Sequence, residues 1–307
     1  MSKITKALEK AARERLARSQ EQPSVPVTPP VVVPVTMRAR LGEIPVAEGI
    51  AIDPHIVSAA EAPSAIAEQY RILRTNLQSL RLRPAPKVIV VTSAVSGEGK
   101  SVTALNLALT LAQQETFRVA LVDGDMRRSS IPRWLGMKPG GKGLSTVLSQ
   151  GGELDGALVN LQSPRLAVLP AGPRPGHPAE LLESVGMKRL LATLKAEFDL
   201  VIIDAPPVLP VADPGILAAQ ADGVLLVVRA GKTQRKTVAE AQELLTKMKA
   251  RLLGCVLTHV EYYLPSYRRY YQQYYSSAKR QDDHREEPGA PLEEPVPPAV
   301  SEPELRN

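Results

Sequence analysis

Short apolar runs alternate with longer amphipathic segments through the middle of this 307-residue chain. Consecutive apolar positions predict buried strands at 87–93, 118–125, 166–170, 199–204, 223–229 and 252–258. Helical periodicity appears before and between them, at 64–80, 100–114, 143–149, 179–196, 212–220 and 233–250. Strands that are apolar on both faces and alternate with helices predict an α/β fold, with a mostly parallel sheet flanked by helices on both faces. We expect this domain to span residues 60–260.

The two ends of the chain follow other patterns. Residues 1–20 place apolar side chains at helical spacing among basic ones, which predicts a basic amphipathic helix. Such a helix is either simply solvated or contacts a membrane or a partner. Residues 21–59 are rich in Pro and Val and predict an extended linker, whereas the acidic, Pro-rich residues 278–307 predict a disordered tail.

Composition adds limits on compartment and partners. No apolar run reaches the roughly 18 residues of a spanning helix, and the first residues lack the apolar core of a signal peptide. The one cysteine, Cys255, lies in an apolar stretch and is expected to be a buried core residue in a reducing compartment. A formal charge of +6 mildly favours anionic partners, but the basic residues are dispersed along the chain, so we expect no nucleic acid.

A glycine-rich turn between the first strand and the following helix reads TSAVSGEGKSV over residues 92–102. Glycines let backbone N–H groups curl around phosphate oxygens at the start of a helix, and Gly-Lys-Ser supplies the charge and the hydroxyl. Lys100 is expected to reach the β- and γ-phosphates and Ser101 to bind Mg²⁺. The strict pattern departs only at Ala94. The predicted nucleotide-binding residues are Ser96, Gly97, Glu98, Gly99, Lys100, Ser101 and Val102.

Acidic residues end two of the predicted strands. Asp204 closes the strand 199–204 and fits a carboxylate that holds Mg²⁺ through water. Asp123 and Asp125, two positions apart, would share one side of a continuing strand, which is costly unless a cation or proton lies between them. We assign Asp125 with Ser101 and Asp204 to the metal, and Asp123 to the proton of an attacking hydroxyl. Arg127 would stabilise the acidic pair or contact phosphate. A polar loop without chemistry is the alternative.

Together the motifs SGEGKS, LVDGDMR and VIIDAPP resemble those of bacterial tyrosine kinases, which are P-loop enzymes with a fold like that of the partition ATPases. The resemblance covers roughly residues 60–276. It implies ATP and Mg²⁺ as cofactors, phosphoryl transfer to tyrosine, and a catalytic set of Lys100, Asp123, Asp125 and Asp204. The basic helix followed by a Pro-rich linker is similar to the autokinases of exosortase-linked exopolysaccharide systems.

The segment EQYRILRTNL matches the E-x-x-R-x-x-R motif of that family at Glu68, Arg71 and Arg74, which there joins subunits into a ring. From their spacing alone, the three residues would equally form a solvated ion-pair row on one helix. The resemblance further implies a homo-oligomer, a separate membrane activator resembling a polysaccharide chain-length regulator, and a cognate tyrosine phosphatase. It places the protein in the cytoplasm, at the inner face of the membrane through that partner.

Seven of the eight tyrosines lie within residues 261–277. Their spacing alone favours an aromatic helix face packed on the domain or at a membrane interface. The segment has arginines but no carboxylate from 262 to 277, and the resemblance implies that it is the autophosphorylation region. We expect transfer between subunits, although the reach of the segment also allows transfer within one chain. The tyrosines concerned are Tyr262, Tyr263, Tyr267, Tyr270, Tyr271, Tyr274 and Tyr275.

Two other functions remain open from the sequence. Partition and septum-positioning ATPases share the expected fold but carry an early lysine in the phosphate loop, where this chain has Val95. A nucleotide-switched membrane scaffold would instead act through the basic helix and the tail. The chain also departs from the kinase pattern: Ser96 replaces a common Pro, His177 a usual Asn, and Thr258 an Asn that frequently contacts adenine.

Overall fold

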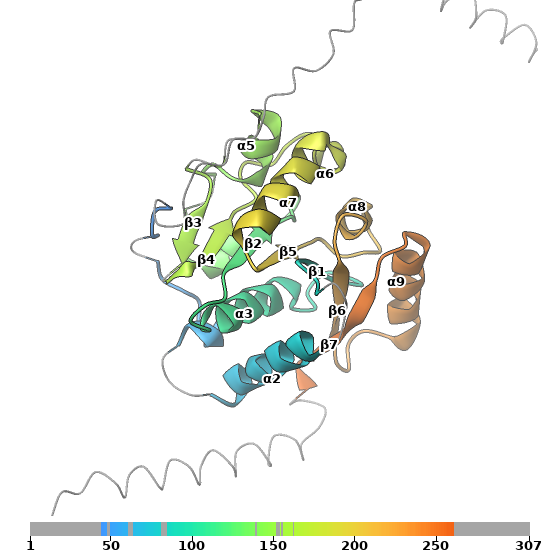
Figure 1. Ribbon diagram of the computed structural model, residues 1–307. Coiled ribbons are helices and arrows are strands. Elements are labelled where there is room, and N and C mark those ends of the chain that lie inside the picture. The colour runs from blue at the N-terminus through green and yellow to red at the C-terminus, as the bar shows by residue number, and fades with distance from the viewer. Residues whose placement is uncertain are drawn as a thin grey trace, which may run out of the picture. The chain divides into compact units, whose positions relative to one another are not determined.

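The computed structural model describes residues 44–47, 50–60, 64–80, 85–138, 140–151, 154, 156–161 and 163–260 (Figure 1). The predicted basic helix, the tyrosine segment 261–277 and the acidic tail lie outside these residues, as does the predicted linker up to residue 43. What was expected of them therefore stays a prediction.

A seven-stranded sheet forms the centre of the described domain, in the order β3-β4-β2-β5-β1-β6-β7. All neighbouring pairs are parallel except β3 with β4. Each of the six predicted strands is present; the short β3 was missed because three residues carry no readable period. The strands are β1 (Val88–Ser93), β2 (Val119–Asp123), β3 (Val159–Leu161), β4 (Ser163–Leu169), β5 (Leu200–Asp204), β6 (Gly223–Arg229) and β7 (Leu252–Thr258).

Helices cover both faces of the sheet, as the apolar strands require (Figure 1). Alternate residues of one strand enter different cores: Val88 and Val90 pack on one side and Ile89 and Val91 on the other. One face carries η2 (Val57–Ala59), α2 (Ala65–Ser79), α3 (Lys100–Ala112) and α4 (Ile131–Trp134). The opposite face carries α5 (Leu144–Ser149), α6 (Pro178–Glu183), α7 (Val185–Glu197), α8 (Asp213–Ala218) and α9 (Arg235–Lys247). The predicted fold class is thus confirmed.

Serine side chains cap the N-termini of two helices. Ser64 was expected to begin the first helix, and its Oγ accepts a hydrogen bond from the Ala67 N–H at 3.0 Å. The single helix predicted over 179–196 is instead two, because the backbone of Ser184 is extended. Its Oγ accepts from the Met187 N–H and so begins α7 anew.

The end of the predicted linker needs correction. Ile44 and Ile56, both within 21–59, are buried in the two cores with 5% and 2% of their surface exposed. The backbone N–H of Ser58 also donates to Oδ1 of the buried Asn106 at 2.9 Å. The described part of this segment therefore packs on the domain. Apolar residues separated by prolines and glycines show no period, so the pattern did not reveal this.

Cys255 was expected in the core, and this was wrong. It lies on β7, which pairs only with β6 at the edge of the sheet in the described residues, and its side chain is exposed. An apolar run on an edge strand reads like one on a central strand, although an edge strand is less completely covered. Within the described ranges, no helix has the length and apolar character needed to cross a membrane.

Candidate active site

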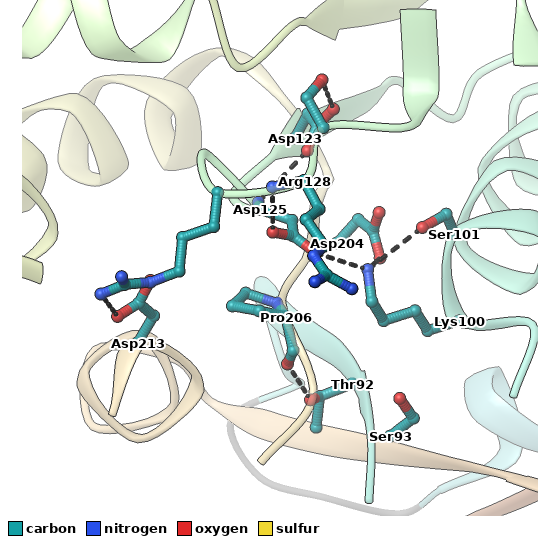
Figure 2. A network of polar contacts seen from close by, with 12 residues as sticks. Thr92, Ser93, Lys100, Ser101, Asp123, Asp125, Arg128, Asp204, Pro206 and Asp213 are labelled. Carbon is teal, nitrogen blue, oxygen red and sulfur yellow. Dashed lines mark hydrogen bonds and ion pairs between the residues drawn. The ribbon is translucent and has the colours of Figure 1, made fainter. Parts of the chain in front are cut away.

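Three motifs meet at the carboxyl ends of β1, β2 and β5. Asp123 and Asp204 are register partners across β2 and β5, and Asp204 is opposite Val91 of β1, from which the phosphate loop follows. Parallel strands bring their carboxyl ends to one edge, where ligands of such sheets bind. The topology therefore brings Lys100, Asp125 and Asp204 together, as Figure 2 shows.

The phosphate loop has the backbone that anion binding requires. Gly97 and Gly99 have φ angles of +81° and +92°, a region that favours glycine, and a Cβ built at Gly97 would meet nothing within 4 Å. Ser93 Oγ donates to the carbonyl of Val95 at 2.8 Å and closes the turn. Because α3 begins at Lys100, the N–H groups of its first turn, including that of Val102, have no partner within the helix and can bind phosphate.

Glu98 was predicted to bind nucleotide, but its side chain turns into the protein. It is 1% exposed, and its carboxylate accepts from the backbone N–H groups of Val95 (2.9 Å) and Arg229 (3.3 Å) and from Oγ1 of Thr233. Thr258 Oγ1 donates to the Glu98 carbonyl at 2.8 Å. The side chain therefore holds the loop on the end of β6, and only the backbone of Glu98 is left to face a nucleotide.

Lys100 lies between two carboxylates. Its Nζ is 3.0 Å from Oδ2 of Asp125 and 3.5 Å from Oδ1 of Asp204, and it donates to Oγ of Ser101 at 3.2 Å. Burial lowers the pKa of Lys100, but the charges of Asp204 and Asp125 more than offset it, so the pKa lies above its ordinary value. The lysine is thus held protonated at the head of α3.

Asp123 and Asp125 make different contacts. The strand predicted to reach residue 125 ends at Asp123, so the expectation that both side chains share one side of a continuing strand was wrong. Asp125 reaches Lys100, whereas Asp123 accepts from its own neighbours, the Asp125 N–H (3.2 Å) and Ser129 Oγ (2.7 Å). Burial, followed by the charge of Asp204, raises the pKa of Asp123 to about 7.

Asp204 is fully buried, and burial raises its pKa. Its Oδ2 has no hydrogen-bond partner in the described part of the chain, which is uncommon for a buried carboxylate oxygen. Nearby, Thr92 Oγ1 donates to the Pro206 carbonyl at 2.6 Å and fixes the turn that follows β5 (Figure 2).

Arg127 was expected at the acidic pair or at a phosphate, and the structure corrects this. Its guanidinium makes a two-pronged contact with the buried Asp213 at the start of α8, with Nε–Oδ2 and Nη2–Oδ1 distances of 2.7 and 2.9 Å. That contact raises the pKa of Arg127. Sequence reasoning missed Asp213 and Ser129, since nothing in their local pattern points to a residue on another loop or element.

The motif on α2 stands apart from these contacts. Arg71 donates to Glu68 at 2.7 Å, whereas Nη1 of Arg74 donates to the carbonyl of Thr110 on α3 at 3.0 Å. The two arginines therefore differ: Arg74 holds α2 on α3, and Arg71 pairs along its own helix. His177, at the start of α6, is exposed and lies 3.3 Å from Glu180.

Mg·ATP fits this arrangement. The first N–H groups of α3 are open, Lys100 supplies a cation, and the unpartnered Oδ2 of Asp204 with the Ser101 hydroxyl supplies oxygen ligands. The described residues hold no group of three His, Cys, Asp or Glu side chains that could bind an ion alone. A P-loop needs none, because nucleotide phosphates and water complete the shell.

Comparisons with known proteins agree with this chemistry. The family model "AAA domain" matches residues 86–253. The tyrosine-protein kinase YwqD of Bacillus subtilis is 38% identical over 220 residues, which cover 70% of this chain and 92% of that protein. The tyrosine-protein kinase CpsD of Streptococcus agalactiae is 34% identical over 214 residues, covering 70% and 92%.

Solved structures resemble the described domain as well. The kinase domain of the Escherichia coli tyrosine kinase ETK has a TM-score of 0.63 at 28% identity, covering 72% of this chain and 84% of that one. The chimerical protein CapA2B2 has a TM-score of 0.63 at 32% identity, covering 71% and 94%.

Proposed function

This chain belongs to the family of bacterial tyrosine kinases, and we propose on that basis that it transfers the γ-phosphoryl group of ATP to tyrosines of its own C-terminal segment. One observation carries the proposal: Lys100, Ser101, Asp125 and Asp204 converge at the head of α3, while Asp123 is buried beside them with a raised pKa. A cation, oxygen ligands and a proton acceptor at one place are what phosphoryl transfer to a hydroxyl needs.

Each residue then has a role. Lys100 and the loop amides bind the phosphates, and Ser101 and Asp204, with Asp125 close by, hold Mg²⁺, which neutralises phosphate charge when bound. Asp123 orients the tyrosine hydroxyl and accepts its proton. A free phenol has a pKa near 10 and a carboxyl of pKa about 7 is a weak base toward it, so the proton moves mainly as charge develops on the attacking oxygen.

The path of the chain supports the C-terminal tyrosines as acceptors. Thr258, at the end of β7, donates to the backbone of Glu98, so the described chain passes the phosphate loop four residues before Tyr262. The segment from 262 to 277 has no carboxylate that the acidic site would repel. Each added phosphate contributes roughly −1.5 to −2 charges. Unmodified segments therefore dock in the site of a neighbouring subunit, and modified ones are released.

Mass spectrometry after incubation with Mg·ATP tests this proposal. We expect phosphate on residues within Tyr262–Tyr275, and none after all seven tyrosines are changed to Phe. Label elsewhere in the seven-Phe variant would refute the choice of acceptor. Release of free phosphate without protein label would point instead to a partition-type ATPase, and lipid binding with neither reaction to the membrane scaffold. The relatives found do not favour these alternatives, and Val95 stands where the partition ATPases have their early lysine.

We further propose that the protein regulates exopolysaccharide synthesis or export as a homo-oligomer, with a ring as the arrangement. Its partners are a separate membrane activator, which holds it at the inner face of the membrane, and a cognate tyrosine phosphatase. The relatives found support the link to polysaccharide synthesis and the activator partnership, whereas the ring and the phosphatase rest on the sequence resemblance alone. Copurification with a candidate activator, with and without the C-terminal tyrosines, tests the partnership.

The two arginines of α2 should respond differently to removal. Arg71→Ala removes a half-buried ion pair within one helix, so we expect a stability change within ~0.5 kcal/mol but loss of the oligomer. Arg74→Ala removes a donor to the Thr110 carbonyl and should cost about 1 kcal/mol in the monomer. Light scattering and chemical denaturation separate the effects. An unchanged solution mass in both variants would contradict the interface.

A further inference from the structure

Two consecutive arginines, Arg127 and Arg128, follow Asp123 and Asp125 just after β2, and their side chains have different contacts. The guanidinium of Arg127 is committed to the buried Asp213 through both Nε and Nη2. Its removal would release α8 from the loop. Arg127 is therefore a structural anchor of the site.

The backbone of Arg128 is equally well held. Its N–H donates to Oδ1 of Asp125 at 2.9 Å and lies 3.2 Å from the Asp125 carbonyl. Its two neighbours in the chain are also held: Arg127 pairs with Asp213, and Ser129 donates to Asp123. The residue thus stands on a rigid stretch of loop, with its position set by the same aspartate that contacts Lys100.

The side chain of Arg128, in contrast, is exposed and makes no hydrogen bond or ion pair with any residue of the described domain. In Figure 2 it extends from the loop toward the part of the site where Lys100 and Pro206 lie. Its guanidinium is exposed and pairs with none of the three aspartates nearby, so it is available to contact a ligand that enters the site.

The charges at the site indicate which ligand the guanidinium of Arg128 would bind. Lys100 is already shared between Asp125 and Asp204, and the acidic residues outnumber it. A phosphoryl group in transfer carries negative charge on its three equatorial oxygens, which a planar guanidinium can contact with two donors. Lysine offers a point charge and lacks that fork.

We propose that Arg128 contacts the phosphoryl group as it is transferred, acting as a second cation opposite Lys100. The inference deepens the proposed kinase function, and it assigns a residue of this chain to the terminal phosphate of the nucleotide. ADP lacks that phosphate. Arg128 should therefore distinguish a nucleoside triphosphate from a diphosphate, whether or not tyrosine is the acceptor.

Binding measurements test this without relying on turnover. We expect Arg128→Ala to weaken binding of a non-hydrolysable Mg·ATP analogue by about 10-fold, while binding of Mg·ADP changes less than about 2-fold. Arg128→Lys should recover part of the loss. Arg133→Ala is the matched control, because it removes an exposed arginine whose guanidinium carbon lies over the ring of Trp134, 5.4 Å from its centroid. Arg133→Ala should leave the affinities for the Mg·ATP analogue and for Mg·ADP unchanged.

Turnover provides a second readout. With saturating nucleotide and protein, kcat for tyrosine phosphorylation should fall about 100-fold in Arg128→Ala. An unchanged preference for the triphosphate analogue over ADP would overturn the inference. If the preference depends on Arg128 but the wild-type protein labels no tyrosine, the inference stands and the proposed kinase function fails.

Discussion

Replacing Lys100 with Met is expected to reduce tyrosine phosphorylation by more than about 1000-fold, because the substitution removes the cation that bridges the phosphates. It should also destabilise the nucleotide-free protein. Asp125 and Asp204 would remain beside each other without the ammonium group that now lies 3.0 and 3.5 Å away. Removing one partner of a buried ion pair costs about 3 kcal/mol.

Transfer of phosphate from labelled ATP measures the first effect, and chemical denaturation at pH 8 measures the second. Lys188→Met, an exposed lysine on α7, serves as a control for the loss of charge and should change neither. Full activity of Lys100→Met with normal folding would exclude the proposed site.

Asp123→Asn should nearly abolish phosphorylation and remove the acid limb of the pH profile. In the wild-type protein, kcat/KM should rise about tenfold per pH unit up to about 7 and then level off, since only the ionised carboxylate accepts a proton and burial raises the pKa of Asp123 to about 7. A residual rate that is flat across this range is expected for the variant. Retention of the same acid limb in Asp123→Asn would assign the ionisation to another group.

The same pKa shift has a stability consequence of definite sign. Because the folded-state pKa of Asp123 lies above the ordinary value of 3.8, the folded protein binds the proton more tightly than the unfolded chain. The stabilisation that the protonated Asp123 gives the folded protein is therefore fully present below pH 4 and is lost as the pH rises to about 7. Asp123→Asn carries no charge, so it should be more stable than wild type at pH 8 by as much as ~4 kcal/mol, and nearly equal to it at pH 4. Urea denaturation at both pH values measures this difference.

Local pattern was enough to predict most of the fold. Six strands were readable because strands buried on both faces are apolar at every position, and helices between them have a separate period. Ser64 was readable as a helix start because the cap acts within three residues. The phosphate loop was readable for the same reason: glycines, Lys100 and Ser101 are adjacent in the chain.

Errors arose where a residue's environment is set by distant segments. Cys255 has apolar neighbours in sequence, but its strand lies at the sheet edge. For Glu98 the nucleotide contact stays a prediction, but its local pattern did not show that its carboxylate is satisfied by the end of β6 and by Thr233. Ile44 and Ile56 lie in a stretch without periodicity and still fill the cores.

For this protein, the order of residues alone determined the α/β domain, the nucleotide loop and the choice of candidate catalytic side chains, because those depend on short-range spacing and on side-chain chemistry. Only the tertiary structure decided which partners neighbouring residues contact. Arg127 binds Asp213 on α8, while Arg128 extends toward the site. Asp123 and Asp125 likewise contact different partners. The reason is physical. A side chain's partner is set by which elements the sheet order brings together, and that order is not encoded in any local pattern.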